Sequence, residues 1–207
     1  MPNMTLYHAS PSRSSVALWM LEEVGQPYDI KLIRLSAGDN LKPDYLAINP
    51  MGKVPALRHG DTVITENGAI CTYLADEFPD KKLNVPVGNT RRGEYLKWMF
   101  FGPSVIEPAI AERAFPRKEP ARPAALGWRD LDTVLEIVSK AVAKGPYLMG
   151  EQFTAADVTI GSGLRFGMMF KLIPERKEFQ DYVARIGQRP AAKRAQDRDK
   201  ELSAQAA

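Results

Sequence analysis

The sequence has little sulfur and no large excess of charge. Its single cysteine, Cys71, has no partner for a disulfide within the chain, a composition typical of a reducing compartment. The 28 basic and 25 acidic residues are mixed along the chain, so there is no basic stripe of the kind that binds nucleic acid. Neither a signal peptide nor an apolar run close to the ~20 residues that span a bilayer is visible. We therefore expect a cytoplasmic protein without a nucleic-acid or membrane partner.

The usual spacings of metal ligands and of hydrolase nucleophiles are also missing. The two histidines, His8 and His59, have no partners at zinc-ligand spacing, and Cys71 falls inside a predicted helix. No Gly-x-Ser-x-Gly motif marks a hydrolase nucleophile. The pattern predicts a site that works without a metal ion.

The first part of the chain alternates between the periodicities of strands and helices. Strands are predicted at residues 4–8, 28–35, 55–58 and 63–64, the last two as a hairpin. Helices are predicted at residues 14–24 and 66–78, and a short helical or irregular piece at residues 42–48. The resulting order, β-α-β-α-β-β-α, is the thioredoxin-like arrangement.

Only helical patterns follow a proline-punctuated stretch at residues 80–88. These helices are predicted at residues 90–115 with a kink near Gly102-Pro103, then at 124–144, 154–170, 175–186 and 191–202. The sequence therefore predicts an α/β domain at residues 1–79, a linker at 80–88 and an all-α domain at 89–207.

Thr154 and Asp157 have the spacing of a capping box at the start of one of these helices. Thr154 can cap the helix while Asp157 reaches back to the Thr154 amide. We interpret this pair as structural, with a contribution of about 1 kcal/mol to stability.

The most informative motif is a proline placed where a strand should begin, followed by an acid–amide pair where a helix should begin. The two pieces are Asn49-Pro50-Met51-Gly52-Lys53-Val54-Pro55-Ala56-Leu57 and Ile64-Thr65-Glu66-Asn67-Gly68-Ala69-Ile70. A cis Val54–Pro55 bond would turn the Val54 backbone outward as an edge for an extended peptide. In content, order and spacing this region closely resembles the glutathione S-transferase family, although Asn67 stands where that family usually has serine. The resemblance is carried by residues 6–189, and it implies the same thioredoxin-like domain followed by an all-helical domain.

The resemblance also implies a glutathione site on the first domain. The Val54 backbone, next to Pro55, would pair with the cysteinyl part of glutathione. Glu66 would bind its γ-glutamyl ammonium, and Asn67 its γ-glutamyl carboxylate. At the glycyl end, Lys53 could meet the carboxylate, and Asn40 lies near a position where relatives have a polar ligand.

The turn at residues 6–15 is where the chemistry is expected. By the resemblance, Ser12 falls at the position of the catalytic hydroxyl in serine-type members, and Arg13 near the position of a cysteine in other bacterial members. Ser12 to Ser15 occupy the place of a thioredoxin Cys-x-x-Cys without any sulfur, which excludes dithiol chemistry. The alternatives are that Arg13, Ser14 or Ser15 contacts the sulfur, or that the serines only cap the helix.

The physical task at this turn is to ionise a thiol. The thiolate is the nucleophile, and lowering a thiol pKa by ~2 units needs about 2.7 kcal/mol of preferential stabilisation. A charge-assisted hydrogen bond supplies roughly 1.5–3 kcal/mol, and a helix N-terminus about 0.3–1 kcal/mol. One serine at a helix start is therefore sufficient without a general base.

The second substrate is expected against the first long helix of the second domain. Tyr95, Trp98 and Phe101 could form an apolar wall there. The alternative is that these aromatics are simply core residues, which is the favoured interpretation for Trp98.

The predicted function is that of a glutathione transferase, in which glutathione is a co-substrate and its thiolate attacks a small hydrophobic electrophile. The family resemblance further implies a homodimer and a role in detoxification. The alternatives are a glutathione-dependent isomerase of the maleylacetoacetate type, a peroxidase or reductase, and a non-catalytic binding module with the same fold.

Overall fold

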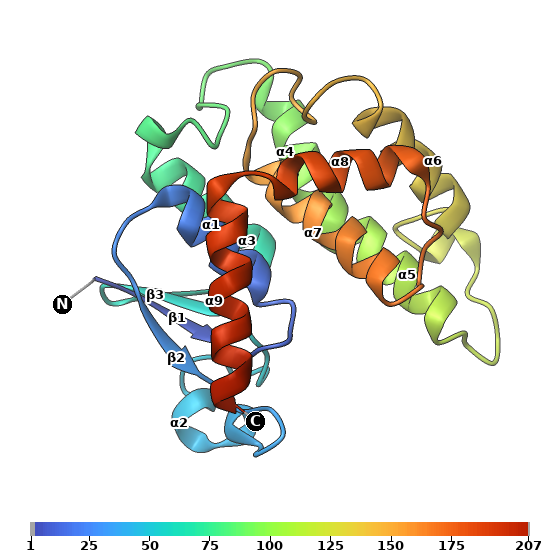
Figure 1. Ribbon diagram of the computed structural model, residues 1–207. Helices are drawn as coiled ribbons and strands as arrows, with labels where there is room; N and C mark the ends of the chain where they lie inside the picture. Colours follow the sequence, from blue (N-terminus) through green and yellow to red (C-terminus); the bar gives the residue numbers. More distant parts are fainter. Residues whose placement is uncertain (1–2, 207) are drawn as a thin grey trace. The chain divides into compact units, whose positions relative to one another are not determined.

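The computed structural model describes residues 3–206, without the side chains of Pro123 and Ala206. The described residues form two compact units (Figure 1). The first unit contains the residues up to Lys81 together with those from Gln188 onward, and the second is Lys82–Gly187. None of the helices within residues 3–206 has both the length and the apolar character needed to cross a membrane.

The first unit is built on a four-stranded mixed sheet. Its strands are β1 (Met4–His8), β2 (Asp29–Leu32), β3 (Ala56–His59) and β4 (Thr62–Thr65), in the order β2-β1-β3-β4. β1 pairs in parallel with β2 and antiparallel with β3, and β3 pairs antiparallel with β4. This arrangement confirms the predicted thioredoxin-like order.

The helices of the first unit are α1 (Ser15–Val24), α2 (Pro43–Leu46), α3 (Asn67–Glu77) and α9 (Pro190–Ala206), with short 3-10 turns η1 (Asp39–Leu41) and η2 (Pro79–Lys81). α1 packs against α3 and α9 (Figure 1). It ends at Gly25, the predicted stop, in the left-handed conformation (φ 67°) that glycine adopts without steric cost. The fully buried side chains of this unit include Leu6, Leu18, Leu21, Leu57, Ile70 and Leu74.

α9 belongs to the first unit, whereas the prediction assigned all of residues 89–207 to a helical domain. Charged pairs join α9 and the residue just before it to α1. Arg189 donates two hydrogen bonds of 2.7 Å to the Glu23 carboxylate, and Arg194 binds Glu22 at 2.8 Å. Sequence periodicity identifies a helix but not its distant partners, so this return of the chain was not predicted.

The second unit is helical. It contains α4 (Arg92–Phe101), η3 (Gly102–Ile106), α5 (Glu107–Ala114), η4 (Pro123–Ala125), α6 (Leu131–Val142), α7 (Ala155–Met169) and α8 (Lys177–Gly187). The predicted interruption at Gly102-Pro103 is confirmed. It is a π-helical segment, η3, between α4 and α5, and Pro103 there has no backbone N–H to give to a helical hydrogen bond.

Two predicted boundaries were wrong, and in both places a polar side chain sets the limit. α6 begins at residue 131 rather than 124, because the Asp130 carboxylate caps it by accepting from the Thr133 amide at 2.7 Å. β2 ends at residue 32 rather than 35. Asp39 accepts from both the amide and the guanidinium of Arg34 and thereby fixes a turn there.

The predicted capping box is confirmed at the start of α7. The buried Asp157 carboxylate accepts from the backbone amides of Thr154 and Leu148, each at 2.8 Å, and from the Tyr182 hydroxyl at 2.7 Å. Burial raises the pKa of Asp157, while these hydrogen bonds act in the opposite direction. The pair joins α7 to α8 and to the preceding loop, so its role is structural.

Candidate functional site

The turn between β1 and α1 holds two serines that differ in exposure. Ser14 is fully buried, and Ser12 is partly exposed. The Ser14 hydroxyl accepts from the Ala9 amide at 3.1 Å and lies 3.0 Å from the Ala9 carbonyl oxygen, to which it can donate. Ser12 Oγ accepts from the Ser14 amide at 3.1 Å and lies 2.7 Å from Ser14 Oγ. Ser14 therefore anchors the turn, and Ser12 presents a hydroxyl at the start of α1.

Behind these serines lies a histidine that the sequence analysis considered only as a metal ligand. The His8 ring is completely buried, its Nδ1 is 2.7 Å from Ser14 Oγ, and its Nε2 is 2.9 Å from Asp199 Oδ1. Asp199 belongs to α9 and is 191 residues away in sequence. No local pattern could have revealed this contact.

The start of α3 lies beside the start of α1. The Asn67 side-chain amide donates to the Arg13 carbonyl oxygen at 3.0 Å, and Asn67 Oδ1 is buried without a partner among the described residues. Glu66 precedes Asn67, is exposed, and has a positive φ of 67°. The Arg13 side chain is exposed. The structure thus brings together two helix N-termini, each with a partial positive charge that favours an anion.

The loop before β3 is held in place by side chains from α2 and its surroundings. The predicted cis Val54–Pro55 bond is confirmed. The Lys53 carbonyl oxygen accepts from the Tyr45 hydroxyl at 2.6 Å and from the Asn49 amide at 2.7 Å. Val54 is half-buried and lies two residues before Ala56, where the pairing of β3 with its neighbours begins.

Asn40 supports the same loop. Its side-chain amide donates to the Gly52 carbonyl oxygen at 2.9 Å. Gly52 has a φ of 62°, and a Cβ there would come within 3.0 Å of the Asn40 carbonyl oxygen, so this close approach requires glycine. Lys53 is exposed beside it.

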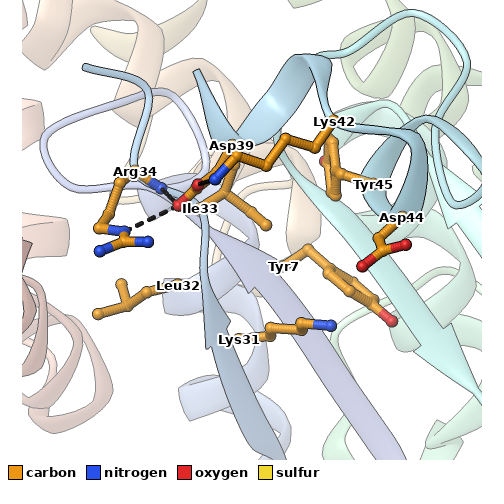
Figure 2. Close-up of a pocket in the computed structure, with 9 residues that line it drawn as sticks. All are labelled: Tyr7, Lys31, Leu32, Ile33, Arg34, Asp39, Lys42, Asp44 and Tyr45. Atoms are coloured by element: carbon orange, nitrogen blue, oxygen red, sulfur yellow. Dashed lines mark hydrogen bonds and ion pairs between the residues drawn. The ribbon is translucent and has the colours of Figure 1, made fainter. Parts of the chain in front are cut away.

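A cavity of about 260 Å³ lies next to Tyr45. Figure 2 shows its lining, which is made by Tyr7, Lys31, Leu32, Ile33, Arg34, Asp39, Lys42, Asp44 and Tyr45. Arg34 and Lys42 both bind the Asp39 carboxylate and hold its pKa well below its usual range. The lining includes none of the residues predicted to bind glutathione, which are Asn40, Lys53, Val54, Pro55, Glu66 and Asn67.

Residues 2–76 match the family model for the glutathione S-transferase N-terminal domain. The chain is 30% identical to glutathione S-transferase GstA of Escherichia coli O157:H7, over 90% of this chain and 94% of that protein. The chain belongs to the glutathione S-transferase family.

Two solved structures that are similar to this chain have the same architecture. The crystal structure of a glutathione transferase from Methylococcus capsulatus str. Bath is 30% identical with a TM-score of 0.80, covering 96% of this chain and 99% of that one. A glutathione transferase homologue from Sulfitobacter, crystallised with bound glutathione, is 25% identical with a TM-score of 0.79 over 96% and 99%. The disulfide-bond oxidoreductase YghU of Escherichia coli (strain K12) is 26% identical over 92% of this chain and 73% of that protein.

The aromatic residues of α4 in this transferase differ in how deeply they are buried. Tyr95 is completely buried and Trp98 is 4% exposed. Trp98 lies against Phe101, with ring centroids 5.4 Å apart, and the Lys97 ammonium lies 4.3 Å from its ring centroid. Phe100, which was not selected from the sequence, is 54% exposed. Phe101 is half-buried, and a second-substrate role for these residues stays a prediction.

The only thiol of the chain lies away from the turn. Cys71 is fully buried in α3, and burial raises its pKa to about 12. It is therefore a neutral core side chain at physiological pH, not a nucleophile.

Proposed function

We propose that this protein catalyses attack of the glutathione thiolate on a small hydrophobic electrophile, with Ser12 as the hydrogen-bond donor to sulfur. The observation that carries the proposal is the partly exposed Ser12 hydroxyl at the N-terminus of α1, fixed from behind by the Ser14 amide and hydroxyl. One donated hydrogen bond and the helix N-terminus together supply about the 2.7 kcal/mol that a fall of ~2 units in thiol pKa requires.

In this proposal, the residues near the turn bind glutathione as an extended tripeptide. The backbone of Val54 is the edge for its cysteinyl portion, next to Pro55. Glu66 takes the γ-glutamyl ammonium, and the spare N–H of the Asn67 amide takes the carboxylate at the start of α3. Lys53 is the candidate partner of the glycyl carboxylate.

Asn40 and Arg13 each combine a structural contact with a proposed role at the site. Asn40 fixes the loop by donating to the Gly52 carbonyl oxygen, and its second amide N–H is the candidate polar contact at the glycyl end of glutathione. Arg13 contributes its charge near the sulfur and holds Asn67 through its carbonyl oxygen. Tyr95, Trp98 and Phe101 form the wall for the electrophile, with Phe101 presenting the accessible ring. The protein is proposed to act as a cytoplasmic homodimer in detoxification.

A difference ultraviolet titration of bound glutathione tests the proposal. We expect a thiol pKa well below that of free glutathione in the wild type, and a pKa higher by about 1–2 units in Ser12→Ala. Ser15→Ala is the matched control, because Ser15 begins α1 on the same turn. An unchanged thiol pKa in Ser12→Ala would remove Ser12 from the role and leave Arg13 or a neighbouring serine.

Glutathione-dependent disulfide reduction is a second candidate, raised by the name of the relative from Escherichia coli K12. The buried Cys71 argues against a route through a thiol of the protein. Turnover of a mixed disulfide, compared with conjugation of an electrophile by the same protein, separates the two reactions, and the Cys71→Ala variant tests whether disulfide reduction runs through a thiol of the protein. A maleyl-type substrate separates transfer from isomerisation, and a binding module would show no thiolate signal.

A further inference from the structure

A row of four polar side chains runs from α9 to the candidate sulfur donor. Asp199 Oδ1 lies 2.9 Å from His8 Nε2, His8 Nδ1 lies 2.7 Å from Ser14 Oγ, and Ser14 Oγ lies 2.7 Å from Ser12 Oγ. The two inner members, His8 and Ser14, are completely buried. Each of these short contacts needs one proton between its two atoms, so the protons along the row are not independent.

The Ser14 hydroxyl has more possible hydrogen-bond partners than it can satisfy at one time. A hydroxyl has one proton to donate and two lone pairs that accept. One lone pair of Ser14 Oγ is already taken by the Ala9 amide at 3.1 Å. Only one lone pair and one proton remain for His8 Nδ1, Ser12 Oγ and the Ala9 carbonyl oxygen.

The proton on His8 Nδ1 decides which way the Ser12 hydroxyl points. If Nδ1 is bare, Ser14 donates to it, and the 2.7 Å contact between the serines must then use the proton of Ser12. If Nδ1 carries a proton, it fills the last lone pair of Ser14, and Ser14 must donate to Ser12. Both lone pairs of Ser12 Oγ are then occupied, by the Ser14 amide and hydroxyl, and its own proton can only point outward.

Asp199 fixes the proton at the other end of the row. Its carboxylate can only accept, so the 2.9 Å contact places a proton on His8 Nε2. A neutral ring then has a bare Nδ1 and turns the Ser12 hydroxyl inward, so only a ring with protons on both nitrogens leaves the Ser12 proton for the sulfur. We propose that His8 forms an ion pair with Asp199, is a donor at both nitrogens and thereby aims the Ser12 hydroxyl at the glutathione sulfur. His8 and Asp199 are thus positioning residues for thiol activation, an inference that rests on the proposed function.

The titration of bound glutathione tests this with Asp199→Asn and His8→Ala. Both variants leave Ser12 in place but release its proton to point inward, so the thiol pKa should rise by about 1 unit. Asp197→Asn is the matched control, because Asp197 is an exposed acid on the same helix, paired with Lys200 at 3.6 Å. It should leave the thiol pKa unchanged.

A conservative replacement distinguishes proton direction from simple packing. The amide of His8→Asn can replace Nδ1–H as a fixed donor to Ser14, whatever the charge of residue 199. His8→Asn should therefore restore most of the lowered thiol pKa, and adding Asp199→Asn to it should cause no further loss. A structural role alone predicts the reverse, since the double variant removes both halves of the contact.

Nitrogen-15 NMR of labelled histidine reports the proton positions without glutathione. The chain has only His8 and His59, so His59→Gln assigns the spectrum. We expect both His8 nitrogens to be protonated in the wild type and Nδ1 to lose its proton in Asp199→Asn. A bare Nδ1 in the wild type would overturn the inference.

The proposed function and the positioning role can be disproved separately. If Ser12→Ala raises the thiol pKa while Asp199→Asn and His8→Ala do not, the positioning role is wrong and the proposed function stands. If Ser12→Ala has no effect, the assignment of Ser12 fails and the positioning role fails with it. Should His8→Ala not fold, Asp199→Asn and the spectrum still decide, because Asp199 is 22% exposed at its side chain.

Discussion

Both units of this transferase bury a polar cluster at the start of a helix, one around Asp157 and one around Ser14. In the second unit, the donors around Asp157 all point at a carboxylate that only accepts, and the cluster is closed. In the first unit, the cluster around Ser14 extends through Ser12 to the surface. A buried polar cluster is thus structural when every proton is used internally, and it becomes a candidate for chemistry when one proton is left over at the surface.

The largest expected effect is on the closed cluster. Asp157→Ala leaves the amides of Thr154 and Leu148 and the Tyr182 hydroxyl without their acceptor, so the free energy of unfolding should fall by about 3–5 kcal/mol. Urea denaturation measures the loss. The control is Asp181→Ala, an exposed acid paired with Lys177, for which a change of about 0.5 kcal/mol or less is expected. A comparable loss in both variants would show that the cluster has no special role.

Ser14→Ala tests the buried end of the open cluster. It leaves the Ala9 amide and His8 Nδ1 without their partner, which should lower the free energy of unfolding by about 1–3 kcal/mol. Unlike Asp157→Ala, it should also raise the thiol pKa of bound glutathione, because Ser14 no longer directs Ser12. Loss of stability with an unchanged thiol pKa would make the two clusters equivalent.

Ser12→Ala tests the surface end of the same cluster. The Ser14 amide loses its cap, so we expect a loss of about 1 kcal/mol in urea denaturation, smaller than for Ser14→Ala. The dominant effect should be on conjugation, measured as kcat/KM with a chromogenic electrophile. A stability loss larger than that of Ser14→Ala would contradict the division into a structural and a functional end.

The smallest effect is expected at alkaline pH. Burial raises the pKa of Tyr45 to about 12, and its hydroxyl holds the Lys53 carbonyl oxygen. A folded-state pKa above the unfolded value of about 10 means that this contribution is complete below pH 10 and is lost as pH rises towards 12. Urea midpoints measured between pH 9 and 11.5 should fall more steeply for the wild type than for Tyr45→Phe. Parallel curves would show that Tyr45 titrates as it does in the unfolded chain.

The sequence predicted what depends on local pattern. The order of strands and helices along the first domain, the helix stop at Gly25, the capping box of Thr154 and Asp157, and the cis Val54–Pro55 bond each follow from residues that are close together in the chain. The helix boundary at Asp130 was missed because a single cap outweighed the amphipathic pattern before it.

What the sequence could not provide is pairing at a distance. The contact between His8 and Asp199 joins residues 191 apart, and the ion pairs of α9 with α1 follow from no periodicity. The Asn67 amide was expected to face the ligand, whereas one of its protons is already given to the Arg13 carbonyl oxygen. Such choices depend on the geometry of the folded backbone.

The return of α9 to the first unit has a consequence for how the protein is made. Residues 82–187 emerge from the ribosome between the two parts of a single folding unit. The sheet can assemble early, but the buried His8 obtains its acid only after residue 199 has been translated. Completion of the polar row from Asp199 to Ser12 is therefore among the last events in biogenesis, and chains stalled before α9 should have a sheet in which His8 lacks its carboxylate partner.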